Sequence, residues 1–373
     1  MTLLPRCFVF LISACAACTS PASSAQSVTP ADLPVGAAII ATINDSQPET
    51  TLLHGVYVQQ HGKMLAERYF KSDDKKIGAI FAHEVDFNAD TLNDTRSVSK
   101  SVIGLLIGIA LEQGKIKSLD TPVVDLLKNI SDQTRDQAKR KITLRHLLTM
   151  SSGLKWDEDG SVSIFSNETV MEFSTDMVRY VLERPVAEAP GRHYVYNSGG
   201  VVLLGAVLET ATGMPLDQYA SQVLFAPLGI DNWEWQTSLI SHQKMAHAGL
   251  RLTPRDLAKI GQLILNRGSW NGRKIVPAEY IQDSITKHLD AEIESGWGYG
   301  YLWRTGTSSV DGREWAWIAA MGNGGQRIFI VPALDLVVAI TAGRYNQAGI
   351  ENGLPSHQLF RKIVSDVAHI SRQ

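Results

Sequence analysis

Five serine–lysine pairs in this chain have the spacing Ser-x-x-Lys, which can place a hydroxyl nucleophile beside an amine base. Only Ser97 is followed at once by a long apolar run, VSKSVIGLLIGIALEQGKI, which predicts a buried helix ending near Gly114. Residues three apart on a helix share a face, so the Lys100 amine would lie within reach of the Ser97 hydroxyl. The pair indicates acyl transfer through a serine. The structural alternative is a helix-capping Ser97 beside a Lys100 that extends its amine toward solvent.

The position of this pair at the start of a helix favours catalysis. Free N–H groups and partial positive charge at a helix N-terminus stabilise an alkoxide and an oxyanion. The same charge, together with an apolar wall, disfavours the ammonium form of lysine. We therefore expect a lowered pKa for Lys100 and a neutral amine that takes the proton of Ser97.

The segments around this helix predict one sheet built from both ends of the chain, with helices between them. Residues 55–70 alternate apolar and polar around a His-Gly-Lys turn, as a β-hairpin does. Strand patterns return at 298–304, 314–320, 326–331 and 334–342, and an amphipathic helix follows at 357–371. Helical patterns begin at Thr143, Thr175, Gly200 and Pro254. The fold class is therefore α+β, an antiparallel sheet flanked by helices with an all-helical subdomain over roughly 105–285.

Composition excludes several functional classes. The 373 residues carry a formal net charge of −3 and no long basic run, so no electrostatic footprint for nucleic acid is present. No dinucleotide fingerprint, phosphate-binding loop or zinc-helix motif occurs, and the ten histidines are scattered. We expect neither a cofactor nor a metal.

The first 25 residues have the sequence organisation of a secretory signal peptide. Arg6 precedes a short apolar stretch, and small residues follow that stretch. Ile12-Ser13-Ala14-Cys15 matches a lipoprotein signal, which would leave Cys15 as a lipid anchor. Cleavage after Ala25 would instead release a soluble protein, and a buried N-terminal helix is the third alternative. Residues 26–36 are expected to be a flexible leader, and 37–373 the folded domain. Export to a bacterial periplasm follows from either processing route.

Four stretches in order resemble serine β-lactamases, penicillin-binding proteins and their esterase relatives. They are RSVSKSVIGLLIGIALEQGKI, ITLRHLLTMSSGL, PGRHYVYNSGGVVLLGAVLE and GNGGQRIFIVPALDLVVAIT. The chain is most similar to the branch of 6-aminohexanoate-dimer hydrolases and carboxylesterases, from about Gly55 to the C-terminus. The resemblance implies a β-lactamase/transpeptidase-like fold, with Ser97 as nucleophile and Lys100 as base.

The resemblance also assigns the second motif of the family. Tyr196-Asn197-Ser198 stands at the family's Tyr-x-Asn or Tyr-x-Ser. Tyr196 would then pass a proton to the leaving group, and Ser198 would contact the substrate. The structural alternative for Tyr196 is a core aromatic. Tyr194 fits the motif less well, because Tyr196 itself stands two residues after it.

The third motif of the family, Lys-Thr-Gly, is absent. The best positional match is Ala320-Met321-Gly322, ahead of Asn323, whereas Arg304-Thr305-Gly306 is expected at the end of a hairpin. Gly322 would let substrate approach the backbone, and the N–H groups of Asn323 and Ser97 would form an oxyanion hole. The structural alternative for the glycine cluster is a tight turn.

Loss of the lysine that holds a substrate carboxylate favours an uncharged ester or a linear amide. The expected partner is a small-molecule or short-peptide acyl substrate, and the oligomeric state stays open. The alternatives are a D-alanyl-D-alanine carboxypeptidase or β-lactamase, and a non-catalytic cell-envelope binding protein.

Overall fold

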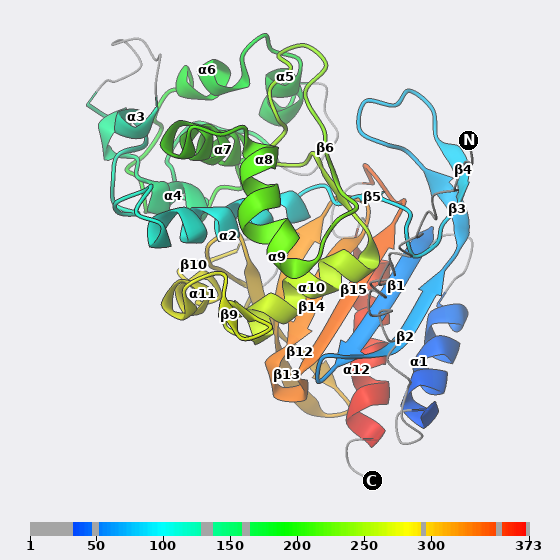
Figure 1. Cartoon of the computed structure of the whole chain (residues 1–373). Coiled ribbons are helices and arrows are strands. Elements are labelled where there is room, and N and C mark those ends of the chain that lie inside the picture. Colours follow the sequence, from blue (N-terminus) through cyan, green and yellow to red (C-terminus); the bar gives the residue numbers. More distant parts are fainter. Residues whose placement is uncertain are drawn as a thin grey trace, which may run out of the picture.

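An eight-stranded antiparallel sheet forms the centre of the molecule (Figure 1). The computed structural model describes residues 33–46, 52–127, 137–158, 165–291, 296–347 and 353–370. The strand order is β10-β11-β12-β13-β14-β15-β1-β2, so the first strand of the sheet lies beside the last. The sheet thus joins the two ends of the chain, as its strand patterns predict.

The predicted hairpin is β1 (Leu53–Gln60) and β2 (Lys63–Tyr69), joined through His61 and Gly62, which both have positive φ. The strands from the C-terminal part are β10 (Leu289–Asp290), β11 (Gly298–Tyr299), β12 (Arg304–Val310), β13 (Arg313–Gly322), β14 (Gln326–Val331) and β15 (Leu336–Ala342). The expected strand at 298–304 is only the two-residue β11. Arg304 directly follows the turn of the β11–β12 hairpin, as expected, and is the first residue of the long strand β12.

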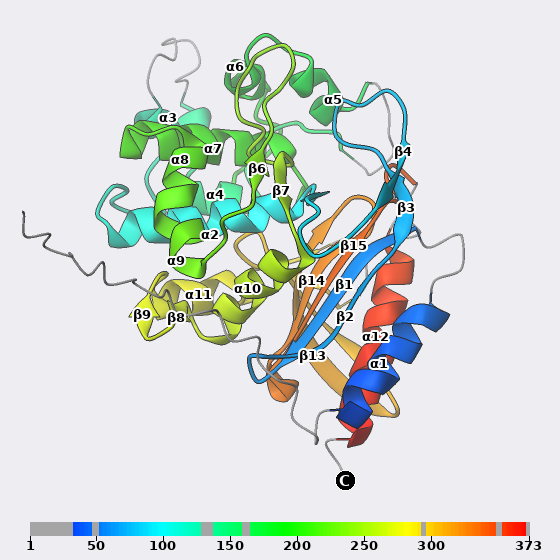
Figure 2. The same ribbon diagram turned by 45° about the vertical axis from the view of Figure 1, so that its right-hand side comes forward.

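Helices α1 (Leu33–Asp45) and α12 (Leu354–Ile370) pack together on one face of the sheet (Figure 2). Ile39 and Ile43 of α1 and Phe360 of α12 share an apolar core with the buried side chains of β1, β14 and β15. Residues 33–36, assigned to a flexible leader by composition, are therefore the first turn of a packed helix. The signal at 1–25 and the rest of the leader to 32 lie outside the described residues.

The other face of the sheet carries α10 (Pro254–Leu265) and the central helix α2 (Val98–Glu112). α2 is buried at every position from Val98 to Ala110, which explains why its sequence is apolar nearly all round. The remaining helical part consists of α3 (Val123–Leu126), α4 (Leu144–Leu148), α5 (Asn167–Glu172), α6 (Met177–Leu182), α7 (Ser198–Thr212), α8 (Leu216–Ala220), α9 (Ala226–Leu228) and α11 (Ala278–Ser284).

Smaller sheets connect these parts. β3 (Lys71–Asp74) pairs with β4 (His83–Asp86), and β8 (Ser269–Trp270) pairs with β9 (Arg273–Lys274). β5 (Asn93–Asp94) and β6 (Glu234–Trp235) both pair with β7 (Leu250–Leu252). Because β5 ends three residues before Ser97, this three-stranded sheet fixes where the helix α2 begins.

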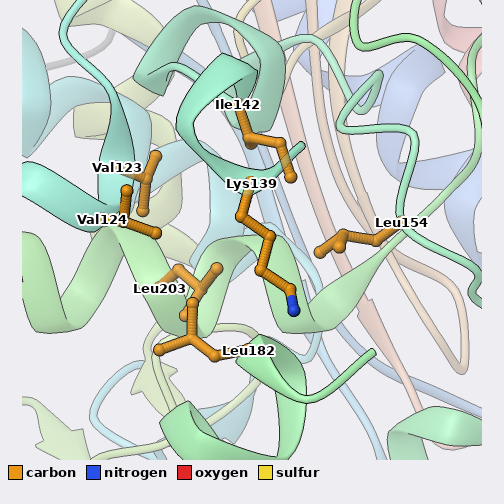
Figure 3. Close-up of a pocket in the computed structure, with 7 residues that line it drawn as sticks. All are labelled: Val123, Val124, Lys139, Ile142, Leu154, Leu182 and Leu203. Atoms are coloured by element: carbon orange, nitrogen blue, oxygen red, sulfur yellow. The ribbon is translucent and has the colours of Figure 1, made fainter. Parts of the chain in front are cut away.

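No single helix among the described residues is long and apolar enough to cross a membrane, although the bent pair 198–212 and 216–228 reaches that length and composition. A small apolar pocket lies among the helices, lined by Val123, Val124, Lys139, Ile142, Leu154, Leu182 and Leu203 (Figure 3). It contains none of the residues to which the sequence assigns chemistry.

Candidate active site

Ser97 is held at the start of α2 by a strained backbone. The Thr95 N–H donates to the carbonyl of Leu250 at 3.0 Å, which ties the segment to β7. Arg96 follows with φ of 51°, an uncommon conformation for a residue other than glycine. Its guanidinium donates to the Lys75 carbonyl at 2.8 Å and stacks 4.3 Å from the ring centre of Tyr345. These contacts hold the turn that places Ser97 at the helix N-terminus.

The predicted serine–lysine pair is formed. Lys100 Nζ lies 2.9 Å from Ser97 Oγ and donates to the carbonyl of His247 at 3.1 Å. Lys100 is buried, whereas Ser97 is half-buried and keeps contact with solvent. Ser97 is therefore partly exposed, whereas the lysine that contacts it is enclosed by the protein.

The charge state of Lys100 differs from the expectation. Burial lowers its pKa, but interactions with Tyr196, Glu158 and Glu168 outweigh burial and leave the pKa raised. The expected lowering was wrong because nearby acidic groups compensate the desolvation of the ammonium. Lys100 is thus protonated at neutral pH when no substrate is bound.

Tyr196 lies beside Lys100 and belongs to the segment just before helix α7. The Lys100 ammonium lies 5.0 Å from the centre of its ring. Asn197 caps helix α7 by accepting a hydrogen bond from the Gly200 N–H at 3.0 Å, and this cap fixes the turn that carries Tyr196. Tyr194 instead lies buried in the core, 4.9 Å from the ring of Tyr299.

Ser198 is fully buried and bonded to two carboxyl groups. Its hydroxyl lies 2.5 Å from Glu158 Oε1 and donates to Glu168 Oε1 at 2.9 Å. Its N–H donates to Glu158 Oε2 at 2.8 Å, and Trp156 Nε1 donates to the same oxygen at 2.7 Å. In this structure Ser198 therefore bridges two glutamates that flank the site.

The two glutamates share one environment but differ in charge. Desolvation, followed by repulsion from Glu168, raises the pKa of Glu158 to about 8. Desolvation also disfavours the charge of Glu168, but Lys100 and His247 overcome it and lower the pKa of that carboxyl. At neutral pH the pair thus holds one proton, on Glu158.

A third carboxylate completes the acidic cluster. Glu172 Oε1 accepts from His247 Nε2 at 2.8 Å, and Glu168 Oε1 lies 3.9 Å from the same nitrogen. Glu168, Glu172 and His247 present one donor atom each within 4.8 Å of one another, a spacing that could hold a metal ion. The Glu172 carboxylate is paired with His247 and that of Glu168 with Ser198, and Glu168 adds negative potential at Lys100.

The end of β13 lies directly against the start of the nucleophile turn. A β-carbon at Gly322 would lie 2.4 Å from the Thr95 carbonyl oxygen and 3.2 Å from Arg96 Cβ, so only glycine fits there. The side chain of Asn323 donates to Asn346 Oδ1 at 2.8 Å, and its Oδ1 accepts from the Asn346 N–H at 2.8 Å. Gly322 therefore packs against the two residues that precede Ser97, and the oxyanion role of Asn323 stays a prediction.

A buried cation stands next to Tyr196. The guanidinium of Arg304 lies 5.3 Å from the ring centre of Tyr196 and 5.5 Å from that of Tyr299. Arg304 begins β12, the strand beside β13, whereas Ala320 is buried in the core. The site thus contains a positive charge that the absence of Lys-Thr-Gly did not predict.

Sequence reasoning missed the glutamates and Arg304. Glu158 and Glu168 are ten residues apart, in a region whose sequence has no strong periodicity, and no motif pairs them with Ser198. The available signal was the acidic residues in the stretch between SSGL and the Tyr196 motif, of which Glu158 and Glu168 are two. For Arg304 the signal was the Arg-Thr-Gly triplet, which resembles the missing Lys-Thr-Gly.

The chain matches proteins of one family over most of its length. The sequence model described as "Beta-lactamase" matches residues 50–352. Esterase EstB of Burkholderia gladioli is 29% identical over 181 residues, covering 46% of this chain and 44% of that protein. A "Putative D-alanyl-D-alanine carboxypeptidase" of Escherichia coli O157:H7 is 25% identical over 265 residues, covering 58% and 61%. The chain thus spans less than two thirds of either relative.

Solved structures show the same fold. The "Putative 6-aminohexanoate-dimer hydrolase from Bacillus anthracis" superposes with a TM-score of 0.66 at 21% identity, covering 89% of this chain and 82% of that one. The resemblance seen in the four sequence stretches and the predicted fold class are both confirmed. With an antiparallel sheet, a helical part and Ser97-x-x-Lys100 at their junction, the chain belongs to the beta-lactamase family.

Proposed function

We propose that this protein is a serine hydrolase that cleaves an ester or a linear amide through an acyl-enzyme on Ser97. The observation that carries the proposal is the 2.9 Å contact between Lys100 Nζ and Ser97 Oγ at the N-terminus of a buried helix. A hydroxyl needs a base within hydrogen-bonding distance to become a nucleophile, and this contact supplies one.

The catalytic cycle follows from the positions of three groups. The neutral amine of Lys100 takes the proton of Ser97 as Ser97 Oγ bonds to the substrate carbonyl carbon. The resulting oxyanion accepts hydrogen bonds from the N–H groups of Ser97 and Asn323. Tyr196 protonates the leaving alcohol or amine as its bond to carbon breaks. Water then attacks the acyl-enzyme and gives one proton to the Tyr196 phenolate. The Lys100 ammonium returns its proton to Ser97 Oγ as the acyl bond breaks, and the acid product leaves.

The raised pKa of Lys100 makes proton loss a precondition of this cycle. Only the neutral amine accepts the proton of Ser97, so turnover follows the small neutral fraction and increases with pH. Ser198 acts here as a bridge that keeps Glu158 and Glu168 beside Lys100, in addition to its assigned place next to the substrate.

The test is the substitution Ser97→Ala, assayed with p-nitrophenyl acetate and labelled with a fluorophosphonate followed by intact-mass measurement. We expect the parent to hydrolyse the ester and gain one adduct, and Ser97→Ala to lose both, a loss of at least about 10³-fold in turnover. The matched control is Ser241→Ala, because Ser241 also has Ser-x-x-Lys spacing, and it should stay active. Turnover retained in Ser97→Ala would refute the assignment. An inert parent would favour the non-catalytic binding protein.

A second candidate is a carboxypeptidase or β-lactamase acting on a substrate with a free carboxylate. It is favoured by Arg304, a buried cation 5.3 Å from the Tyr196 ring, where an anionic group of the substrate could be compensated. Release of D-alanine from a D-alanyl-D-alanine peptide, or rapid nitrocefin hydrolysis, would establish this candidate over the esterase.

We further propose that the protein is exported to the bacterial periplasm. Support comes from the signal-like sequence of residues 1–25, in which Cys15 lies at a lipoprotein-type site and Ala25 at a small-x-small site. Intact mass of the protein from its native host distinguishes a lipid-modified Cys15 from a chain starting at Gln26. An unprocessed Met1 would contradict export by this signal.

A further inference from the structure

The backbone carbonyl of His247 helps to set the direction of the Lys100 amine. Lys100 Nζ lies 2.9 Å from Ser97 Oγ and 3.1 Å from the His247 carbonyl oxygen. To take the proton of Ser97, the neutral amine must point its lone pair at Ser97 Oγ, so its N–H groups need acceptors elsewhere. The His247 carbonyl accepts from one of them. Because the lysine side chain has a flexible four-carbon stem, this contact restricts the amine to the reactive orientation.

The side chain of His247 anchors the residue that carries this carbonyl. His247 is fully buried, and its Nε2 lies 2.8 Å from Glu172 Oε1. Its Nδ1 has no hydrogen-bond partner among the described residues, so the ring proton belongs on Nε2, which donates to Glu172. Backbone hydrogen bonds on either side join Met245 to Gln236 at 3.0 Å and Gly249 to Met245 at 2.7 Å. The ring's bond to Glu172 therefore adds an anchor at His247 itself.

Glu172 is held by the same loop to which His247 belongs. It is the last residue of α5, and its carbonyl accepts from Ser238 Oγ at 2.9 Å. Ser238 lies in the β6–β7 loop with His247, and Figure 1 shows this loop running beside α5. Gln243 of the loop adds a contact, because its Oε1 accepts from the Met177 N–H at 2.7 Å. The Glu172 carboxylate thus meets the His247 ring from a backbone that is itself fixed.

Stability alone does not explain an imidazole at this position. A buried Nδ1 without a partner costs free energy that an apolar ring of the same size would not cost. The imidazole is explained if its bond to Glu172 places the carbonyl that receives Lys100. We propose that Glu172 and His247 are positioning residues that direct the Lys100 amine at the nucleophile. The inference rests on the proposed function and adds two residues that act through the base.

The test compares His247→Gln with His247→Asn. The amide nitrogen of glutamine is as many bonds from Cα as histidine Nε2 and still donates to Glu172, whereas that of asparagine is one bond nearer to Cα. We expect His247→Asn to lower kcat/KM for p-nitrophenyl acetate, and the rate of fluorophosphonate labelling of Ser97, by about 10- to 100-fold. His247→Gln should stay within about threefold of the parent in both. The matched control is His61→Asn, since His61 also pairs with a carboxylate, that of Asp335 at 3.0 Å, and it should equal the parent.

A double-mutant cycle tests whether the two residues act through one another. Glu172→Ala should lose as much activity as His247→Asn, and the double variant should lose no more than either. Glu172→Gln keeps an acceptor oxygen and should lose less. Losses that multiply in the double variant overturn the proposal, as does an unchanged rate in His247→Asn. Equal losses in His247→Gln and His247→Asn also overturn it, because they would assign the effect to the imidazole ring rather than to its hydrogen bond.

Hydrogen exchange of peptides that cover 244–250 gives a readout without turnover. Exchange should be faster in His247→Asn than in the parent and close to the parent in His247→Gln. Equal exchange in all three refutes the positioning role. If His247→Asn does not fold, Glu172→Ala and Glu172→Gln carry the same comparison, because the Glu172 side chain is partly exposed. A parent that hydrolyses no ester and gains no fluorophosphonate adduct refutes the proposed function instead, and hydrogen exchange still decides whether Glu172 anchors His247.

Discussion

The substitution Glu158→Gln tests the proton held between the two carboxyl groups. The amide of glutamine has the shape of a protonated carboxyl, so its oxygen can accept from Trp156 Nε1 and the Ser198 N–H as Glu158 Oε2 does. Its NH₂ replaces the protonated oxygen beside the Ser198 hydroxyl. The variant is therefore a copy of the low-pH state of Glu158 that cannot ionise.

The expected effect is a difference in how stability depends on pH. The pKa of Glu158 is about 8 in the folded chain against 4.5 for the ordinary group, so between these values the folded state holds a proton that the unfolded state has released. Stability from this group is complete below pH 4.5 and is lost as pH rises toward 8. From pH 6 to pH 8 the parent should lose about 2 kcal/mol of unfolding free energy that Glu158→Gln does not lose, taking 1.36 kcal/mol for each pKa unit.

The assay is urea unfolding followed by tryptophan fluorescence at pH 6, 7 and 8. Glu84→Gln is the control, because it removes a carboxylate from an exposed ion pair with Lys71, and such pairs contribute little. The free energy of unfolding of Glu84→Gln should change with pH in the same way as that of the parent. If the free energies of unfolding of the parent and of Glu158→Gln also change with pH in the same way, Glu158 does not hold a proton in the folded state. The reasoning about the acidic cluster then fails.

Two further predictions concern the catalytic groups. Because the pKa of Lys100 is raised, log(kcat/KM) for p-nitrophenyl acetate should increase with pH by about one unit for each pH unit between 6 and 8, after subtraction of the Ser97→Ala rate. A flat profile would mean that Lys100 is neutral at rest or is not the proton acceptor. Gly322→Ala should lower kcat/KM by about 10- to 100-fold without unfolding the protein, since its β-carbon would lie 2.4 Å from the Thr95 carbonyl oxygen. Gly200→Ala, with ordinary 3.5 Å contacts, is the control, and equal activity of both variants would show that the β13 end tolerates displacement.

Local patterns in the sequence were sufficient to predict α2, the β1–β2 hairpin and the strands β13 to β15. In these elements burial decides the residue type at nearly every position, so the periodicity is strong. β12 was missed because its sequence RTGTSSV is small and polar, and only its pairing with β13 makes it a strand. The helix at Leu33 was missed for a similar reason, since its packing partner α12 is more than 300 residues away in sequence.

The sequence also predicts some features of the active site and not others. Ser97 and Lys100 lie on one helix face, so their proximity follows from their spacing. The acidic cluster is assembled from α5, the end of the 137–158 segment and the loop before β7, and its effect on the pKa of Lys100 depends on tertiary contacts alone. This is why the sequence located the base but gave the wrong sign for the shift of its pKa.

The position of β1 in the sheet has a consequence for biosynthesis. β1 lies between β2 and β15, and Leu53 pairs with Ala342, so the central strands stay incomplete until nearly the whole chain has left the ribosome. Closing so long a loop is a slow step in folding. Gly322, which packs against the turn of Ser97, also belongs to this late part. A nascent chain would therefore be inactive until its last strands are made, and truncation before β15 should abolish catalysis even though every proposed catalytic residue is present.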